Sequence, residues 1–280
     1  MSILRDYDEY CKTYDNFRFA DGANVMSYMI KGMLKKDPLK IHMLEAGCGT
    51  GNYSLAFLQN GIGKLTLLDA SNGMLAKAKS KLSNYEERVV EIKEHPLPEI
   101  PFADGTFDAC TFIEVLHHLD TVKNEEEVSK HNNLKKALVE AHRVLKPGGV
   151  LLIDTCFREN LNGFCTGLAP KTNAYLERLF IDEEILISFL KENGFTNMSC
   201  ISRPGCILYK DNFKIENILD PVWRGCDSSW QILEENGELD SVLKLVQKHK
   251  DKGTLEQLER QFKKVNDKVG DHTMLFAQKL

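Results

Sequence analysis

No run of apolar residues in this 280-residue sequence approaches the roughly 18 residues that a membrane-spanning helix needs. The N-terminal stretch MSILRDYDEYCKTYDNFRF carries charges along its whole length, so it does not have the apolar core of a secretory signal. The net charge is only -5, so the chain has no basic field to attract nucleic acid or an anionic membrane surface. We therefore expect no nucleic-acid partner and no membrane insertion.

The sequence also lacks a C-x-x-C pair, although it has 8 cysteines scattered along the chain. Scattered cysteines, several of them in apolar runs, are typical of reduced thiols in the cytosol and not of a disulfide framework. We expect a cytoplasmic protein with no bound metal. Because no internal repeat or low-complexity linker is visible, we treat residues 1–280 as a single domain with additions.

What the chain does have is a regular alternation of short apolar runs with amphipathic segments. The predicted strands lie at about 40–46, 65–70, 88–94, 108–115, 149–156, 196–202 and 272–280. The predicted helices lie at 23–35, 52–60 and 73–82, in a long segment ending at Lys146-Pro147-Gly148-Gly149, and between the N-cap Asp182 and Gly194. Strands that are apolar on both faces and alternate with helices predict a doubly wound α/β fold.

Three segments fall outside this alternation. Residues 1–38 precede the first strand and are expected to form an N-terminal helical cap. Residues 157–180 follow the fifth strand, and residues 207–270 separate the last two strands and contain one clear amphipathic helix at 254–268. Ligands of open α/β sheets bind beyond the carboxyl ends of the strands. We therefore expect both helical additions on the ligand side, with 157–180 as the better lid candidate.

A glycine-rich stretch, LEAGCGTGNYS (44–54), follows the first predicted strand. Gly47 and Gly49 allow a sharp turn close to a ligand, although a plain strand-to-helix turn is the simpler interpretation. The dinucleotide fingerprint is G-x-G-x-x-G, whereas G-C-G-T-G brings the third glycine one residue too early. Glu45 would repel a pyrophosphate, and Asp69 at the end of the second strand can accept both hydroxyls of a ribose. A ligand with a ribose, a positive charge and no phosphate, such as S-adenosylmethionine, fits these features.

The sequence resembles class I S-adenosylmethionine-dependent methyltransferases, most closely the small-molecule type similar to the methyltransferases of ubiquinone and menaquinone biosynthesis. The matching strings are LEAGCGTG (44–51), LLDASNGML (67–75), PFADGTFDA (101–109), EVLHHL (114–119) and EAHRVLKPGGVLLID (140–154). The resemblance runs from about Tyr14 to Asp154 and returns at Phe276-Ala277. It implies a Rossmann-like seven-stranded sheet in which the last strand, HTMLFAQKL, is antiparallel.

The resemblance further implies that S-adenosyl-L-methionine is the cofactor and that one set of residues contacts it. The glycines would wrap its methionine part above a supporting carboxylate, an aspartate would hold the ribose, and apolar side chains would pack by the adenine. The early string YDNFR (14–18) would close over the cofactor carboxylate, or else form a solvated helix start. Many relatives carry an aspartate where this chain has a proline-containing run, 94–100. The adenine would then be held by backbone groups and a leucine, or by a carboxylate elsewhere in the chain. The set consists of Tyr14, Arg18, Glu45, Gly47, Gly49, Gly51, Asp69, Ala70, Met74 and Leu97.

Methyl transfer is an in-line displacement at a sulfonium, so the protein mainly orients the reactants and excludes water. A base is needed only when the acceptor arrives protonated. Our catalytic candidates are His117 and Glu114, just past the fourth strand, with His118 as a weaker one. A structural hydrogen bond is the alternative for each, and Glu114 could instead touch the cofactor or a cationic acceptor.

Other residues are candidates for the acceptor side. Asp154, Arg158 and Tyr175 could line its pocket, and the string PVWRGCDSSW (221–230) could form an aromatic wall or simply anchor the helical addition. Four cysteines flank the same side without any recognisable thiol motif, namely Cys156, Cys165, Cys206 and Cys226.

The sequence thus predicts transfer of a methyl group from S-adenosylmethionine to a small-molecule acceptor with an oxygen, nitrogen or carbon nucleophile. Transfer to a thiol or an arsenical is one alternative. A catalytically inactive, S-adenosylmethionine-binding regulatory protein is an alternative from another class. A nicotinamide-dependent oxidoreductase is disfavoured by the spacing of the glycines and by Glu45.

Overall fold

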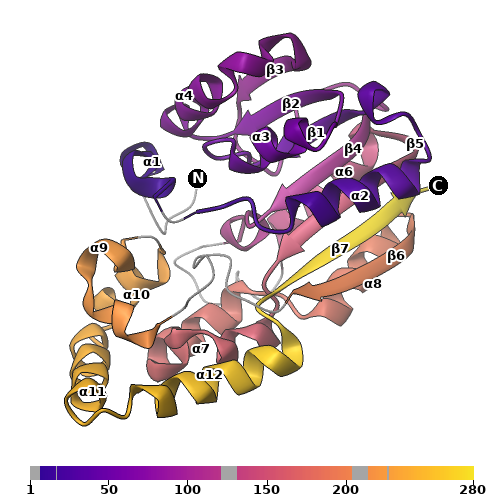
Figure 1. Ribbon diagram of the computed structural model, residues 1–280. Helices are drawn as coiled ribbons and strands as arrows, with labels where there is room; N and C mark the ends of the chain where they lie inside the picture. The colour runs from indigo at the N-terminus through magenta and orange to yellow at the C-terminus, as the bar shows by residue number, and fades with distance from the viewer. Residues whose placement is uncertain (1–6, 17, 121–130, 204–213, 226) are drawn as a thin grey trace.

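The computed structural model describes residues 7–280 except 17, 121–130, 204–213 and 226 (Figure 1). Its centre is a seven-stranded sheet in the order β3-β2-β1-β4-β5-β7-β6. The strands are β1 His42–Ala46, β2 Lys64–Asp69, β3 Val89–Glu94, β4 Phe107–Ile113, β5 Leu145–Thr155, β6 Phe195–Arg203 and β7 His272–Lys279. β7 runs antiparallel to both of its neighbours, β5 and β6. The predicted doubly wound sheet with an antiparallel last strand is confirmed.

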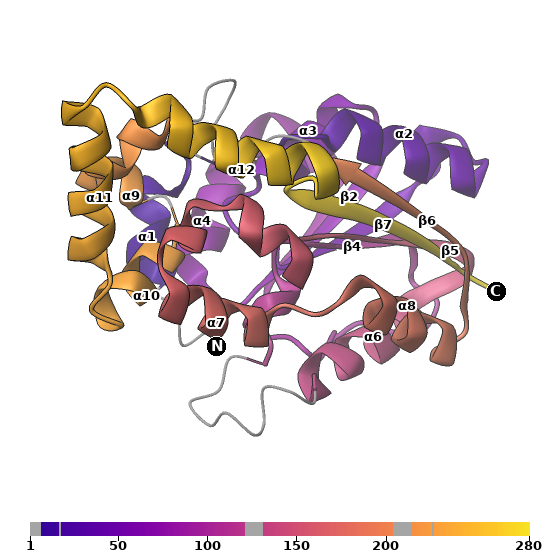
Figure 2. The ribbon, with the colours of Figure 1, turned by 90° about the horizontal axis from the view of Figure 1, so that it is seen from below.

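Helices cover both faces of the sheet, as the view from below makes plain (Figure 2). On one face lie α2 Ala23–Leu34, α3 Asn52–Gln59 and α4 Asn72–Lys81, and on the other α6 Asn132–Val144 and α8 Glu183–Glu192. α2 buries Ala23, Met26, Ser27 and Ile30, the three- and four-residue spacing of one helix face. None of the described helices is both long enough and apolar enough to cross a membrane.

The helix end predicted at Lys146–Gly149 is misplaced. α6 already ends at Val144, and β5 begins at the next residue, Leu145. Two steps along β4 correspond to five along β5, because Phe107 pairs with Leu145 and Ala109 with Val150. The Nζ atom of Lys146 lies 3.0 Å from a carboxylate oxygen of Asp108. This ion pair spans the bulge that the Lys-Pro-Gly-Gly segment makes in β5.

The helical additions have an apolar core of their own. The first comprises η4 Arg158–Gly163, η5 Cys165–Leu168 and α7 Pro170–Leu179, and the second η6 Ile215–Leu219, α9 Pro221–Arg224, α10 Ser229–Glu235, α11 Leu239–Asp251 and α12 Leu255–Val269. Trp223 and Trp230 are buried in this core with their rings 5.8 Å apart, and Ala169 of the first addition joins them. The tryptophans therefore anchor the helices. The division into one domain with additions at 157–180 and 207–270 and a cap at 1–38 stays a prediction.

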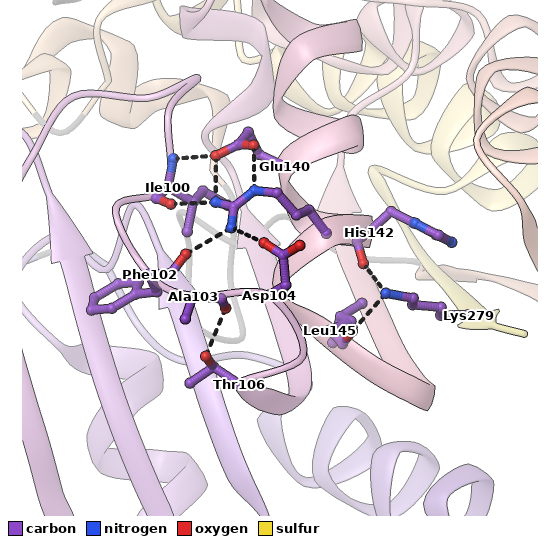
Figure 3. Close-up of polar contacts among 10 residues, drawn as sticks. Ile100, Phe102, Ala103, Asp104, Thr106, Glu140, His142, Leu145 and Lys279 are labelled. Carbon is purple, nitrogen blue, oxygen red and sulfur yellow. Dashed lines mark hydrogen bonds and ion pairs between the residues drawn. The ribbon is translucent and has the colours of Figure 1, made fainter.

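A polar network around Arg143 fastens the loop before β4 to α6 (Figure 3). The guanidinium donates to the backbone carbonyls of Ile100 and Phe102, each at 2.8 Å, and to the carboxylates of Asp104 and Glu140. Glu140 in turn accepts a hydrogen bond from the Ile100 N–H at 3.0 Å. The predicted string PFADGTFDA (101–109) is thereby tied to the helix that covers it.

We expect Arg143→Ala to lower the free energy of unfolding by about 1–3 kcal/mol, because it removes several charge-assisted hydrogen bonds from a partly buried group. The control is Arg260→Ala on α12, whose ion pair with Glu256 is exposed at both ends and should matter by at most about 0.5 kcal/mol. Urea denaturation measures both values. Equal losses in the two variants would contradict the structural role of Arg143.

Candidate functional site

A cavity of about 630 Å³ opens at the carboxyl ends of the parallel strands. Its walls come from the turn after β1, the ends of β2, β4 and β5, the start of β7, the N-terminal helix α1 Tyr7–Tyr14 and both helical additions. The volume lies within the range of about 300–1,000 Å³ that is usual for small-molecule sites. The site therefore lies where the α/β topology predicts it.

Two glycines shape the turn after β1. Gly47 has a φ of +83°, and a Cβ there would lie 2.6 Å from a methyl group of Val115, so no side chain fits. Gly49 has a φ of +52°, and a Cβ there would meet nothing within 4 Å. The first glycine thus lets the turn pack against the residues that follow β4, and the second leaves an open cradle in the cavity wall.

Asp69, the last residue of β2, braces this turn. One carboxylate oxygen accepts the Gly49 N–H at 2.8 Å, and the other accepts the Ser71 N–H at 2.9 Å. Burial raises the pKa of Asp69 above its ordinary value, and the backbone hydrogen bonds oppose that rise. An ionised carboxylate has about four lone-pair sites, so two stay available to hydroxyl groups of a ligand.

Ala70, Met74 and Leu97 continue the wall beyond Asp69, as predicted for an apolar slot. Met74 lies on α4 and is only 1% exposed. His95 and Pro96, which precede Leu97, line the same part of the cavity. The proline-containing run therefore reaches the cavity, and its contact with an adenine ring stays a prediction.

The N-terminal helix α1, which lies within the segment 1–38 expected to be helical, covers this half of the cavity. The Asp8 carboxylate accepts hydrogen bonds from the Ser71 hydroxyl at 2.6 Å and the Gly73 N–H at 2.9 Å. Tyr14 and Arg18 both line the cavity, with the guanidinium carbon 5.6 Å from the centre of the tyrosine ring. Both residues therefore belong to the roof of the site.

Two members of the predicted contact set do not line the cavity. Glu45 is 2% exposed and accepts a hydrogen bond of 2.5 Å from the Ser54 hydroxyl of α3. Burial raises its pKa to about 8, although the hydrogen bond from Ser54 opposes this. Gly51 directly precedes α3 and packs against Ala78. Both residues lie behind the glycine turn, and their part in ligand binding stays a prediction.

The other half of the cavity begins where β4 ends, at Glu114. The predicted strand continued to residue 115, but Glu114 has a φ of +52°, which no strand residue adopts. Its Oε1 atom lies 3.3 Å from Nε2 of His272, the first residue of β7. Burial alone would raise the pKa of Glu114, but the charge and hydrogen bond of His272, aided by His117 and Arg18, lower it to about 2.

His272 was not among the predicted site residues. Burial opposes its protonation, but the Glu114 carboxylate outweighs this and raises the pKa of His272 above its ordinary value. The signal that could have identified it is topological. β7 runs antiparallel to β5 and β6, so its first residue lies at the edge of the sheet where those strands end.

His117 lines the cavity beside Glu114. Its ring stacks on Phe180 with centroids 4.8 Å apart, and its buried Nδ1 atom has no hydrogen-bond partner among the described residues. Burial lowers the pKa of His117 below its ordinary value, although Glu114 and Asp227 oppose this. His118 instead faces the roof, where its Nε2 atom lies 3.0 Å from the Tyr7 hydroxyl. A neutral imidazole in a buried wall can accept a proton.

The rest of this half is mainly apolar and comes from both helical additions. It includes Leu161, Phe164, Leu176, Leu179, Phe180 and Ile232, together with the buried hydroxyl of Thr166. Asp227, Ser228 and Ser229 of the string PVWRGCDSSW also reach the cavity, whereas its tryptophans do not line it. Both additions therefore contribute to one wall.

Three residues expected near the acceptor do not line the cavity. Asp154 is fully buried and pairs with Arg203 at 2.7 Å. Arg158 pairs with Asp182 at 3.2 Å. Asp182 is the N-cap residue of α8, as predicted, although its side chain makes no capping hydrogen bond. Tyr175 packs against the apolar cluster that forms this wall but does not line the cavity itself. The first two are engaged in ion pairs that keep them out of the cavity wall.

The cysteine side chains that the structure describes form no thiol cluster. Cys156 lines the cavity, Cys206 and Cys226 lie outside the described residues, and the side chain of Cys165 is likewise not described. Across the described part of the chain, no group of three His, Cys, Asp or Glu side chains could hold a metal ion.

Known proteins resemble this chain over the part that contains the glycine turn and the ends of β2 and β4. Residues 44–153 match the family described as the methyltransferase domain. A demethylmenaquinone methyltransferase of Desulfitobacterium hafniense is 31% identical over 128 residues, covering 45% of this chain and 46% of that protein. A malonyl-[acyl-carrier protein] O-methyltransferase of Serratia marcescens is 32% identical over 113 residues, covering 40% and 37%. The chain thus spans less than half the length of these two relatives.

The fold has a counterpart among solved structures. A protein from an antibiotic biosynthesis pathway of Anabaena variabilis superposes with a TM-score of 0.69 at 17% identity, covering 91% of this chain and 97% of that one. At this identity the likeness concerns the fold alone. Residues 44–153 thus resemble a methyltransferase domain, and the fold of the whole chain has a solved counterpart.

Proposed function

We propose that this protein transfers a methyl group from S-adenosylmethionine to a small-molecule acceptor. The proposal rests on the observation that one cavity has two halves of different chemical character. One half has the glycine turn braced by Asp69, and the other has the buried imidazole of His117 among apolar side chains. A site that only bound the nucleoside would not need the second half.

The cofactor half fits S-adenosylmethionine residue by residue. The open cradle at Gly49 lets the ligand approach the backbone, and Asp69 keeps lone pairs for the ribose hydroxyls. The apolar slot of Ala70, Met74 and Leu97 suits the adenine. Arg18 would close over the cofactor carboxylate. When bound, the cofactor supplies a methyl group that is already activated at a positively charged sulfur.

The acceptor half suits a mainly apolar molecule. Among the described residues that line the cavity, Arg18 is the only lysine or arginine, and it lies in the roof of the cofactor half. A phosphate or diphosphate on the acceptor would therefore lack a strong cationic partner there. The apolar wall from both additions excludes water from the site of transfer.

His117 would remove the proton from an acceptor that arrives protonated. The lowered pKa keeps the imidazole neutral near pH 7, so it can act as a base. Stacking on Phe180 fixes the plane of the ring. Glu114 lies beside it and is ionised, so it contributes charge and not proton uptake.

Loss of the Asp69 carboxylate should weaken binding of S-adenosylhomocysteine by an order of magnitude or more. The reason is that Asp69→Ala removes charge-assisted hydrogen bonds worth roughly 1.5–3 kcal/mol. Titration calorimetry measures the affinity, and Asp251→Ala on the exposed face of α11 is the matched control. Unchanged affinity would refute the ribose role, and binding of NAD in place of S-adenosylhomocysteine would overturn the cofactor assignment.

Incubation with a metabolite pool and a labelled methyl donor should yield a labelled small molecule. A protein that binds the donor but labels nothing from such pools would count against catalysis and favour a regulatory role. Identification of the labelled product also tells oxygen, nitrogen and carbon acceptors from thiols or arsenicals.

His117→Gln should slow labelling by about 10²–10⁴-fold if the acceptor loses a proton in the reaction. Because the folded pKa of His117 lies below about 6.5, the wild-type rate should be level near pH 7–8 and should fall as the pH drops through that pKa. The variant should lose this acid limb, whereas His142→Gln on α6 should keep it. An unchanged pH profile in His117→Gln would exclude the base role.

A further inference from the structure

Glu114 adopts a backbone conformation that is unfavourable for a residue with a side chain. Its φ is +52°, and its N–H donates to the carbonyl of Asp154 at 2.9 Å. Such a conformation persists only where the surrounding structure enforces it, and it is concentrated at functional sites. Here it turns the chain out of β4, so that the carboxylate lines the cavity.

His272 holds this carboxylate from the other side of β5. The Glu114 side chain is 16% exposed and that of His272 only 5%, with Oε1 and Nε2 3.3 Å apart. The imidazole ring also packs edge-on against Phe164 of the first helical addition, with centroids 5.9 Å apart. The ring thus contacts both Phe164 and the carboxylate, and it places a titratable cation beside Glu114.

The pair lies next to the turn that would hold the methionine part of the cofactor. Val115, the residue after Glu114, is so close to Gly47 that a Cβ on the glycine would clash with it. Glu114 shares the cavity wall with Gly47, Tyr14 and Arg18. A ligand stretched from Asp69 along the glycine turn would bring its middle atoms toward this carboxylate.

We propose that Glu114, positioned by His272, recognises the positive charge at the sulfur of S-adenosylmethionine and thereby distinguishes the substrate from S-adenosylhomocysteine. The inference rests on the proposed function, because it presumes that this cavity binds S-adenosylmethionine. Glu114 would touch the cofactor, whereas His272 is a positioning residue that acts through Glu114.

The chemical difference between the two ligands explains how Glu114 would distinguish them. They differ by one methyl group and one positive charge, so a carboxylate that is shielded from water attracts the substrate more than the product. Transfer of the methyl group removes the charge that Glu114 recognises. Methyl transfer therefore weakens the binding of S-adenosylhomocysteine, which favours its release and replacement by S-adenosylmethionine.

Other titratable and charged groups also act on Glu114. They are His117 on η3 (Leu116–His118), Arg18 and Tyr14 in the roof, Tyr53 on α3, Asp154 on β5 and Arg203 on β6. A pH effect on one ligand alone would mix all of these groups. The ratio of the two dissociation constants, compared between variant and wild type at the same pH, isolates the part that depends on Glu114.

The test measures dissociation constants of S-adenosylmethionine and S-adenosylhomocysteine by titration calorimetry at pH 8.0 and 6.0. We expect the wild-type protein to favour S-adenosylmethionine by about tenfold. Glu114→Gln should bring the ratio close to one and leave the affinity for S-adenosylhomocysteine within about threefold. The control Glu159→Gln changes an exposed carboxylate of η4 and should keep the wild-type ratio.

His272→Gln tests the positioning role separately. Without the imidazolium, burial should raise the pKa of Glu114, so the preference for S-adenosylmethionine should survive at pH 8.0 and fall at pH 6.0 relative to wild type. An equal loss at both pH values, or no loss, would overturn the role of His272. A ratio unchanged in Glu114→Gln would overturn the charge recognition. Failure of the wild-type protein to bind either ligand would refute the proposed function instead.

Discussion

Backbone hydrogen bonds hold β7 antiparallel between β5 and β6, with Thr273 opposite both Thr155 and Ser202. This pairing brings the first residue of β7 to the edge where the parallel strands end. It is the reason that a histidine from the last strand meets a glutamate that follows β4. The same arrangement encloses the Asp154–Arg203 ion pair, which links β5 to β6 beside β7. The contact between His272 and Glu114 in the second half of the cavity therefore depends on the position of β7 between β5 and β6.

The two carboxylates of the cavity show how differently one fold treats the same chemical group. Asp69 is held by backbone N–H groups, and burial raises its pKa. Glu114 is held by an imidazole, and the charge of that imidazole lowers its pKa despite burial. The first carboxylate is a hydrogen-bond acceptor shaped by a turn. The second is a fixed negative charge shaped by an ion pair.

Sequence reasoning located the sheet because its signals are local. Apolar runs, glycines at turns and the carboxylate that ends β2 each depend on a few neighbouring residues. The end of α6 was misplaced because the Lys-Pro-Gly-Gly segment forms a bulge within β5, and that bulge depends on long-range pairing with β4. Most helices of the additions also escaped notice, since the shorter ones have too few turns for a clear period.

For the site, eight of the ten residues expected to contact the cofactor line the cavity, as do both catalytic candidates. Glu45 and Gly51 do not, because the turn places them toward α3 and α4. His272 could not be inferred from its neighbours in the chain. Its place beside Glu114 arises from the register of β7. The two residues are 158 positions apart in the chain, so a local sequence pattern cannot reveal their contact.

The helical additions have a hydrophobic core that is separate from the two apolar layers packed on the sheet. Trp223, Trp230 and their neighbours stabilise the additions largely among themselves, while the sheet keeps its own two apolar layers. Residues on the inner surface of the additions, such as Leu176 and Ile232, instead pack with Cys156, which directly follows β5, so they join the additions to the sheet at the cavity. Under the proposed function, substitutions in this cluster would reshape the acceptor half of the cavity, while Asp69 and the glycine turn would keep their mutual contacts.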